Sequence, residues 1–306
     1  NESFHLYNGN IIDIGSTQIG TFNLSSKGII SIINTGIFSI GVILAIRMWR
    51  ESINDNDFFQ RTRKPFVIGI AGDSGSGKDT LSDAIAGIFG KHSITTISGD
   101  DYHIWDRYKP MWQVMTHLNP MANNLESFSQ DVLSLTDRKT ISARTYNHET
   151  GKMSKHARVN SNDFIIASGL HALYLPQLRD SYNLKIYLDI EEDLRRHFKI
   201  KRDVGVRGHE LNKVLESLEI REKDSNKFIR PQKKHAYLVL SLQQTRPLEF
   251  IDNINESGQF KVVATTFNGL SEINLNRVLV GLCGLHVEMD IGNDGSRVQM
   301  TVEGDA

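Results

Sequence analysis

The sequence predicts an α/β fold, a parallel sheet flanked by helices, preceded by one transmembrane helix. Strand-like apolar runs alternate with helical stretches from Pro65 on, and this alternation is typical of a parallel sheet covered by helices. The first of these runs leads directly into a glycine-rich turn. A separate apolar span without charge, Gly28–Ile46, predicts the membrane helix.

Composition excludes several classes of function. The formal net charge is -1 over 306 residues, so bulk electrostatics give no case for a nucleic-acid partner. Cys283 is the single cysteine, which rules out an intrachain disulfide and a cysteine-based zinc site. The chain begins with Asn1 rather than Met, so we expect a fragment or a processed product.

The apolar span is about as long as the roughly 20 residues that cross a bilayer as a helix. Arg47 and Arg50 follow it, whereas Lys27 is the one basic residue just before it. The positive-inside rule then places the C-terminal domain in the cytoplasm, as a single-pass membrane protein. A buried core helix is the alternative, because Asn34, Thr35 and glycines interrupt the span.

The expected elements of the soluble part follow in order. The strands are expected at Phe66–Ile70, Ile94–Ser98, Phe164–Ala167, Leu184–Ile190 and Tyr237–Leu242. The helices are expected at Asp79–Phe89, Ser127–Ser134, Glu191–Val204 and Leu211–Lys223. After Thr245 short strands broken by Gly and Asn are expected, either completing the sheet edge or forming a small β appendage.

The glycine-rich turn fits the phosphate-binding loop pattern G-x-x-x-x-G-K at Gly72–Lys78. Small residues let backbone N–H groups close around phosphate oxygens, and the helix N-terminus and Lys78 add positive charge. We therefore expect a P-loop NTPase-type sheet, although a turn without a ligand remains the alternative. The expected ATP and phosphate ligands are Gly72, Asp73, Ser74, Gly75, Ser76, Gly77, Lys78, Asp79 and Thr80.

A carboxylate and two basic groups follow the second expected strand. Asp100 stands where the strand ends, so its carboxylate could accept a proton from an attacking hydroxyl. His103 and Arg107 are spaced one helical turn apart, which predicts that both face the same side. The alternative is a solvated Asx turn.

Two further basic segments carry candidate anion ligands. Lys199, Arg202 and Asp203 lie on the expected helix Glu191–Val204, and Arg207 follows; the alternative is a solvated basic face. Tyr146-Asn147-His148-Glu149-Thr150-Gly151 precedes the other basic stretch and reads as a hairpin over the site or as a surface turn.

Together these segments resemble the phosphoribulokinase and uridine kinase family, and more closely its phosphoribulokinases. The similar motifs run in the same order along roughly residues 66–242. They are GDSGSGKDT at Gly72–Thr80, GDDYH at Gly99–His103, HLNPMANNLESF at His117–Phe128, YNHETG at Tyr146–Gly151, GLH at Gly169–His171, YLDI at Tyr187–Ile190, KIKRDVGVRGH at Lys199–His209 and RPQKKHAYLVL at Arg230–Leu240.

The resemblance implies a kinase that uses ATP and Mg²⁺. It implies that Asp100 is the catalytic base, that Lys78 holds the ATP phosphates, and that Arg202 and Asp203 complete the catalytic pattern. It implies that the acceptor, a sugar phosphate such as ribulose 5-phosphate, is held by His103, Arg107, Lys199 and Arg207, with Tyr146 and His148 above it.

Two positions depart from the family pattern. The acidic metal ligand before G-L-H is Ser168 here, and the hydroxyl residue after the loop lysine is Asp79. We hypothesise a ligand exchange, in which Asp79 and Thr80 hold Mg²⁺ and Ser168 bonds a metal-bound water. The alternative is a decayed site that binds nucleotide without turnover.

The expected organisation is an N-terminal exoplasmic segment at 1–27, a transmembrane helix at 28–47, a juxtamembrane linker at 48–64, a P-loop kinase domain at 65–244 and a β-rich extension at 245–306. The expected partners are a small phosphorylated sugar or nucleoside and the lipid bilayer, with no nucleic acid; a homo-oligomer is left open. The alternative functions are a uridine or nucleoside kinase and a membrane-tethered nucleotide-binding regulator.

Overall fold

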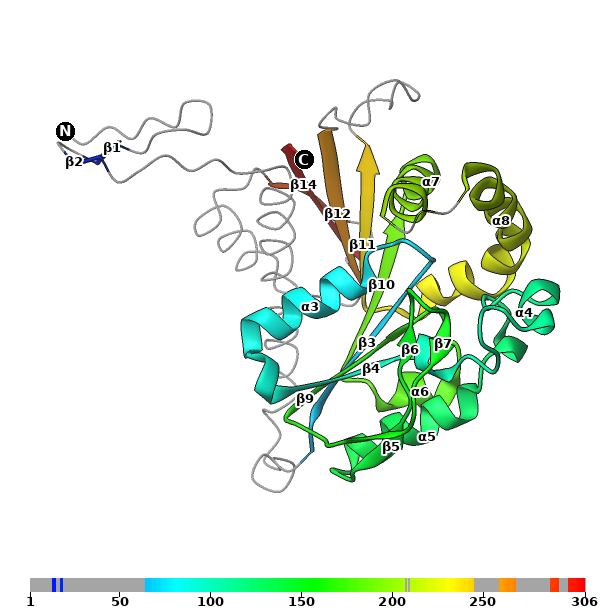
Figure 1. The fold of residues 1–306 in the computed structure, drawn as a ribbon. Helices are drawn as coiled ribbons and strands as arrows, with labels where there is room; N and C mark the ends of the chain where they lie inside the picture. The colour runs from blue at the N-terminus through cyan, green and yellow to red at the C-terminus, as the bar shows by residue number, and fades with distance from the viewer. Residues whose placement is uncertain are drawn as a thin grey trace.

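The structure is a computed structural model that describes residues 13–14, 17–18, 64–206, 208, 210–244, 259–267, 287–291 and 297–305. Its described strands include an eight-stranded sheet flanked by helices (Figure 1). In sheet order the strands are β13 (Val287–Ile291), β14 (Arg297–Asp305), β12 (Gln259–Phe267), β11 (Leu238–Gln244), β10 (Leu184–Ile190), β3 (Phe66–Gly72), β9 (Phe164–Gly169) and β4 (Ile94–Ser98).

The five strands from β11 to β4 are parallel, as the alternating pattern predicted. Strand β12 pairs antiparallel with β11, and β14 and β13 continue the sheet in antiparallel pairs. Of the two forms expected after Thr245, the described strands therefore take the first: they extend the edge of the same sheet.

Alternation of side chains along the strands builds a core on each face of the sheet. Ile68 and Ile70 of β3 face a cluster that includes Ile85 of helix α3 (Lys78–Phe89). Val67 and Ala71 face the opposite cluster. That cluster is closed by α5 (Leu125–Thr136) and α6 (Pro176–Ser181), so helices cover both faces (Figure 1).

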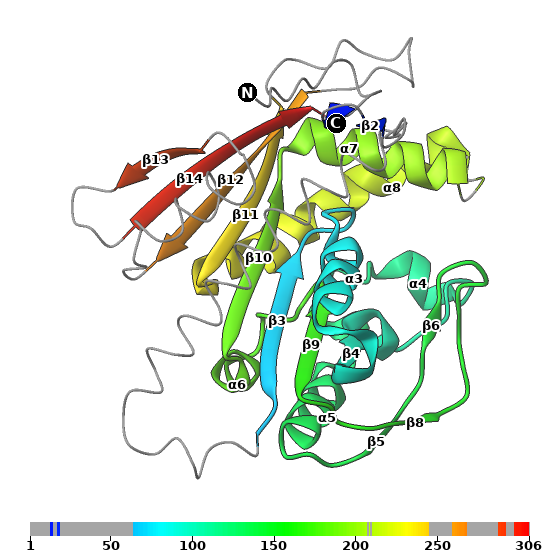
Figure 2. The same cartoon turned by 90° about the vertical axis from the view of Figure 1, so that its left-hand side faces the viewer.

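Several of the remaining elements lie around the carboxyl ends of the parallel strands. Figure 2 shows α7 and α8 beyond the end of β3, where the glycine-rich turn lies. These elements are η2 (Gly99–Tyr102), α4 (Pro110–Val114), η3 (Pro120–Ala122), α7 (Glu192–Ile200), η4 (Lys201–Val206), α8 (Leu211–Asp224), η5 (Ser225–Ile229) and η6 (Arg230–His235). The short strands β5 (Ile141–Ala143) and β8 (Ala157–Val159) pair, as do β6 (Tyr146–Asn147) and β7 (Lys152–Met153), and β1 (Asp13–Ile14) with β2 (Thr17–Gln18).

Two helices differ from the prediction at their C-terminal ends. The α-helix expected to reach Val204 ends at Ile200, and a π-helical segment, η4, continues to Val206. Helix α8 likewise passes into a π-helical segment, η5. Hydrogen bonds to the fifth residue widen such turns, and π-helical turns occur frequently at functional sites.

The predicted location, a single-pass membrane protein with its kinase domain facing the cytoplasm, is wrong. No helix within the described ranges is long and apolar enough to cross a bilayer. The predicted span, residues 28–47, and the expected linker up to residue 63 lie outside the described residues. The apolar run contains Asn34, Thr35 and glycines, and this content weakens the signal on which the prediction depended.

Candidate active site

The phosphate-binding loop joins β3 to α3 at the carboxyl edge of the sheet. Gly75 and Gly77 have φ of 86° and 89°, a left-handed conformation that glycine adopts without steric cost. Gly77 caps α3 without any side-chain hydrogen bond, so the first N–H groups of the helix are left for an anion. The buried Ser76 hydroxyl has no hydrogen-bond partner among the described residues. The loop therefore fits a bound phosphate.

Lys78 folds back over this loop. Its ammonium donates to the carbonyl oxygens of Gly72 at 3.0 Å and of Asp73 at 2.8 Å. Burial lowers the pKa of Lys78, while the carboxylates of Asp100, Asp79 and Asp73 act in the opposite direction. The Lys78 ammonium thus lies in the electrostatic field of three carboxylates, one of them Asp100 at the end of β4.

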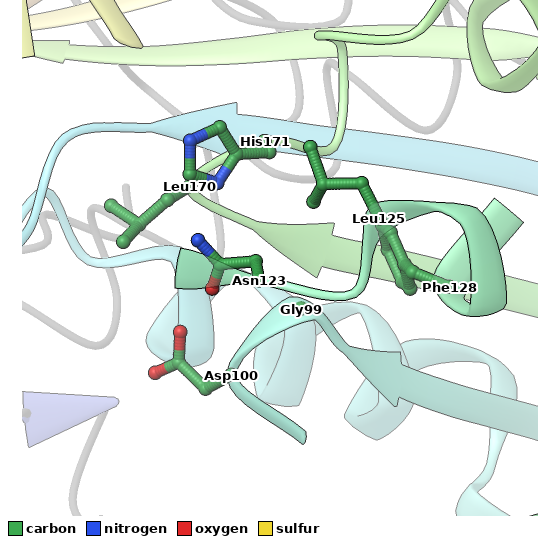
Figure 3. Close-up of a pocket in the computed structure, with 7 residues that line it drawn as sticks. All are labelled: Gly99, Asp100, Asn123, Leu125, Phe128, Leu170 and His171. Carbon is green, nitrogen blue, oxygen red and sulfur yellow. The ribbon is translucent and has the colours of Figure 1, made fainter. Parts of the chain in front are cut away.

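Asp100 lies between two histidines. Its Oδ1 is 3.8 Å from His103 Nε2, and its Oδ2 is 3.5 Å from His148 Nε2. Figure 3 shows Asp100 at the rim of a pocket that Asn123 and His171 also line. A carboxylate with a histidine on each oxygen is suited to orient and accept the proton of a hydroxyl.

His148 reaches Asp100 because the β6–β7 hairpin is fastened to the segment after β4. The Tyr146 N–H donates to Asp101 Oδ1 at 2.6 Å, and the Met153 N–H donates to Asp106 Oδ1 at 3.0 Å. Burial raises the pKa of Asp101 to about 6. Of the two alternatives for this segment, the structure has the hairpin over the site.

Arg107 adds two further bonds to the same hairpin. Its Nη2 donates to the His148 carbonyl at 2.7 Å, and its N–H donates to the Gly151 carbonyl at 2.8 Å. The prediction that a helical turn carries His103 and Arg107 is wrong, because the chain from 103 to 107 is not helical. Tyr146 nevertheless brings them together: its ring centroid is 5.2 Å from that of His103 and 5.9 Å from the Arg107 guanidinium.

Lys199 and Arg202 converge on Asp203 at the α7–η4 junction. Lys199 Nζ lies 3.0 Å from Asp203 Oδ2, and Arg202 Nε lies 3.0 Å from Oδ1. Burial and the neighbouring Arg221 lower the pKa of Lys199 to about 8. Burial alone would raise the pKa of Asp203, but Lys199 and Arg202 outweigh it and lower that pKa to about 2. Arg207 lies outside the described residues.

The predicted metal positions lie at the ends of β9 and at the start of α3. Ser168 is 3% exposed and pairs in register with Ser98 of β4. Beside it, a Cβ on Gly169 would lie only 2.9 Å from the Gly99 Cα, so the two strand ends meet through backbone alone. Within the described ranges no three His, Cys, Asp or Glu side chains form a metal cluster. Mg²⁺ beside nucleotide phosphates usually takes one or two carboxylates, so the oxygen donors Asp79, Thr80 and Ser168 fit it.

The sequence did not point to a set of charged side chains behind the loop. Asp73 is 5% exposed and accepts hydrogen bonds from the Ser74 N–H at 2.6 Å and from the Ser225 hydroxyl. Arg195 Nη1 and Arg230 Nε lie 3.8 and 3.7 Å from its oxygens. We call this set the Asp73 network; its members are Asp73, Ser225, Arg195, Arg230, Glu192 and Glu222. The one signal for the Asp73 network in the sequence is the large number of charged residues in α7 and α8.

A family model described as "Phosphoribulokinase / Uridine kinase family" matches residues 67–248, more than half of the chain. The chain belongs to this family. The resemblance drawn from the motifs is thereby confirmed. Kinases of the phosphoribulokinase and uridine kinase family transfer phosphate to a hydroxyl group and use ATP with Mg²⁺, as the motifs implied.

Family members from both branches are similar to the chain. A phosphoribulokinase of Synechocystis sp. is 37% identical over 183 residues, which are 60% of this chain and 55% of the relative. A uridine kinase of Ligilactobacillus salivarius is 32% identical over 184 residues, 59% of this chain and 86% of the relative. The chain spans about half the length of the phosphoribulokinases it matches.

The fold of the family has also been found in a solved structure. A phosphoribulokinase from Rhodobacter spheroides matches with a TM-score of 0.61 at 20% identity, covering 78% of this chain and 90% of that one. At this identity the match supports the fold and not the substrate. A Triticum aestivum relative, 31% identical over 228 residues, covering 69% of this chain and 56% of the relative, is named a chloroplastic phosphoribulokinase.

Proposed function

We propose that the chain is an ATP-dependent kinase that transfers the γ-phosphoryl group of Mg-ATP to a hydroxyl of a sugar phosphate. The observation that carries the proposal is the position of Asp100. It acts on the Lys78 ammonium of the phosphate loop and has a histidine beside each carboxylate oxygen. A base between a phosphate-binding lysine and a polar pocket suits phosphoryl transfer to a hydroxyl.

The chain's own residues then have separate tasks. Asp100 takes the proton of the acceptor hydroxyl, while Lys78 stabilises negative charge on the transferring phosphoryl oxygens. Arg202 adds a second positive charge, since it also acts on Lys78. Bound Mg-ATP would supply the phosphoryl group and the charge of the metal.

The cations on the acceptor side favour an acceptor that already carries phosphate. Lys199, Arg202 and Arg221 lie within electrostatic reach of one another, and among the described residues Asp203 is the carboxylate within ion-pair distance of the first two. The excess positive charge suits a dianionic phosphate group. We therefore favour a sugar phosphate over a nucleoside such as uridine. The ligand exchange at Asp79, Thr80 and Ser168 is part of the same proposal.

The proposal is tested by ADP release from the chain with Mg-ATP. The acceptors are ribulose 5-phosphate, other pentose phosphates and uridine, and Lys78→Ala is the matched inactive variant. Turnover on a sugar phosphate that is absent from Lys78→Ala supports the proposal. Turnover on uridine alone would assign the chain to the nucleoside branch, and ATP binding without ADP release on any acceptor would indicate a nucleotide-binding regulator.

A further inference from the structure

Two adjacent residues at the end of α8 reach two different loops. Asp224 is the last residue of α8, and its Oδ2 accepts a hydrogen bond from the Thr116 hydroxyl at 2.6 Å. Ser225 is the first residue of η5, and its hydroxyl donates to the carboxylate of Asp73. Thr116 lies 108 positions from Asp224, and Asp73 lies 152 positions from Ser225. The junction of α8 with η5 therefore bridges two segments that are far apart in the sequence.

The two bridged segments belong to the two halves of the proposed active site. Asp73 is part of the proposed phosphate-binding loop. Thr116 lies between α4 and η3, in residues 115–119, which we call the acceptor segment. In this segment the His117 ring lies 5.2 Å from the ring of His103, a proposed acceptor ligand. One helix end thus contacts both the side proposed to hold ATP and the side proposed to hold the acceptor.

The helix geometry at this junction explains how adjacent residues can serve two segments. Successive side chains of an α-helix point about 100° apart, so neighbouring side chains face different directions. The α-helix ends at Asp224, and the π-helical segment η5 begins at Ser225. Such wide turns are rare and occur frequently at functional sites. Ser225 is 1% exposed, so its hydroxyl needs a partner within the protein, and Asp73 provides one.

A small core cluster supports the junction from below. Its buried members are Leu118, Leu170 and Ile229, which come from the acceptor segment, from the chain after β9 and from η5. Gln232 is 3% exposed, and its Nε2 donates to the carbonyls of Leu170 and Phe228 at 2.8 and 2.9 Å. Close packing and satisfied buried hydrogen bonds make a support of this kind stiff. The hydrogen bonds of Asp224 and Ser225 therefore start from a fixed base.

We propose that Asp224 and Ser225 are positioning residues that set the separation between the phosphate-binding loop and the acceptor segment. Transfer needs the reacting atoms at about 3 to 3.5 Å, and a misplacement of about 1 Å can lower the rate about 100-fold. The two residues share one peptide bond, so a displacement of one loop is passed on to the other. Both act through Thr116 and Asp73, so kcat depends on them more than either KM does. This inference rests on the proposed function and adds two positioning residues to it.

Thr116→Val is the first variant to test, because valine has the shape of threonine without the hydroxyl. We expect kcat to fall about tenfold, while the KM values for ATP and for a phosphorylated acceptor stay within about twofold of those of the unaltered chain. Thr116→Ser keeps the hydroxyl and should keep kcat. Thr136→Val is the matched control, since the Thr136 hydroxyl donates to the Val132 carbonyl within α5, and its kcat should not change. An unchanged kcat in Thr116→Val, or an equal fall in Thr116→Ser, would overturn the proposal.

A double variant tests whether the two hydrogen bonds act as one unit. We expect Ser225→Ala to lower kcat about tenfold as well, and the chain with both Thr116→Val and Ser225→Ala to fall no further than either single variant. The physical reason is that breaking either bond already disconnects the two loops. A loss of about 100-fold in the double variant would mean two independent supports, and a shared bridge would then be wrong.

Hydrogen exchange tests the bridge without any turnover. Mass spectrometry of the full chain without substrates measures amide exchange in the phosphate-binding loop, residues 72–78. We expect Thr116→Val to raise exchange in this loop at least about threefold, because the bridge is the route between the two segments, and Thr116→Ser to leave it unchanged. Raised exchange confined to the acceptor segment would overturn the proposal. If exchange in the loop rises but the unaltered chain phosphorylates no acceptor, the proposed function fails and the bridge is supported.

Discussion

The hydroxyl of Ser225 donates a hydrogen bond to the carboxylate of Asp73, joining the phosphate loop to the π-helical turn that follows α8. The two residues are 152 positions apart in the sequence. Arg195 of α7 and Arg230 of η6 lie near the same carboxylate, and Glu192 and Glu222 bind both arginines. The proposed phosphate-binding loop is therefore fastened to the helices that carry the cations proposed to hold the acceptor.

Removal of one arginine of the Asp73 network should loosen the loop. We expect Arg195→Gln to raise the KM for ATP about tenfold, equivalent to about 1.4 kcal/mol, with an unchanged KM for the acceptor. The physical reason is that the Arg195 side chain is 5% exposed, and its loss leaves buried carboxylate charge less compensated. Steady-state kinetics with each substrate varied in turn measure the effect.

Arg179→Gln is the control for that substitution. Arg179 also has a structural role, since its guanidinium donates to the carbonyls of Leu173 and Tyr174, but it does not contact the loop. Both KM values should stay unchanged in Arg179→Gln. An equal rise of both KM values in Arg195→Gln would show that the network supports the fold in general rather than the loop.

The charge of Lys199 should make the KM for the acceptor depend on pH on the alkaline side. Its pKa is about 8, so the ammonium is charged below that pH and becomes neutral above it. We expect the KM for a phosphorylated acceptor to rise above about pH 8, by up to about tenfold per pH unit. Lys199→Arg should remove this rise, since arginine stays protonated, whereas the exposed neighbour variant Lys201→Arg should retain it. A rise that persists in Lys199→Arg would assign the limb to another group.

Asp79 is expected to replace the missing carboxylate at Ser168. We predict that Asp79→Ala keeps its fold but lowers Mg-dependent turnover about 100-fold, because a direct metal ligand is lost. Asp83→Ala removes an exposed carboxylate from the same helix and should be silent. Turnover measured over a range of Mg²⁺ concentrations tests the loss of activity, and a circular dichroism spectrum tests whether the fold is kept. Normal turnover by Asp79→Ala would mean that the ligand exchange is wrong.

Asp101 should make the stability of the fold depend on pH. Its pKa rises from 3.8 to about 6 on folding, so the folded state binds the proton more tightly between these values. Stability contributed by this proton is present below about pH 4 and is lost as the pH rises through 6. Urea unfolding should give a lower free energy of unfolding at pH 7 than at pH 5. This difference should be smaller in Asp101→Asn, whose side-chain oxygen can still accept the hydrogen bond from the Tyr146 N–H. An unchanged difference in that variant would contradict the assignment.

Much of the fold could be predicted because its signals are local. The apolar runs at β4 and β10 gave the bounds of these strands, and the glycine pattern placed the start of α3 at Asp79, one residue after its observed start at Lys78. The π-helical segments were not predicted, because the spacing of apolar residues in the sequence does not reveal a single wider helical turn. The helical turn expected from His103 to Arg107 failed because Asp101 and Asp106 bind hairpin N–H groups, and such partners are distant in the sequence.

Candidate site residues were predictable where a motif carried them, and their partners were not. Asp100, Lys78 and His148 were each proposed from a short motif, and the structure brings them together. Asn123 lay within a quoted motif, and its hydrogen bonds to His103 and to the His117 carbonyl are seen only in the structure. Arg195 was not singled out from the sequence, because the sequence pattern does not reveal that this arginine is buried.

The contact between Gly99 and Gly169 has a consequence for how this site can change over time. Because no side chain separates the two strand ends, the spacing between the proposed base and the proposed metal position is set by the thickness of the backbone. A larger residue at either glycine would push the two strand ends apart, and with them Asp100 and Ser168. The other glycine could not compensate, because no residue is smaller than glycine. New substrate preferences in this chain are therefore more accessible through the β6–β7 hairpin and the acceptor-side helices than through the strand ends themselves.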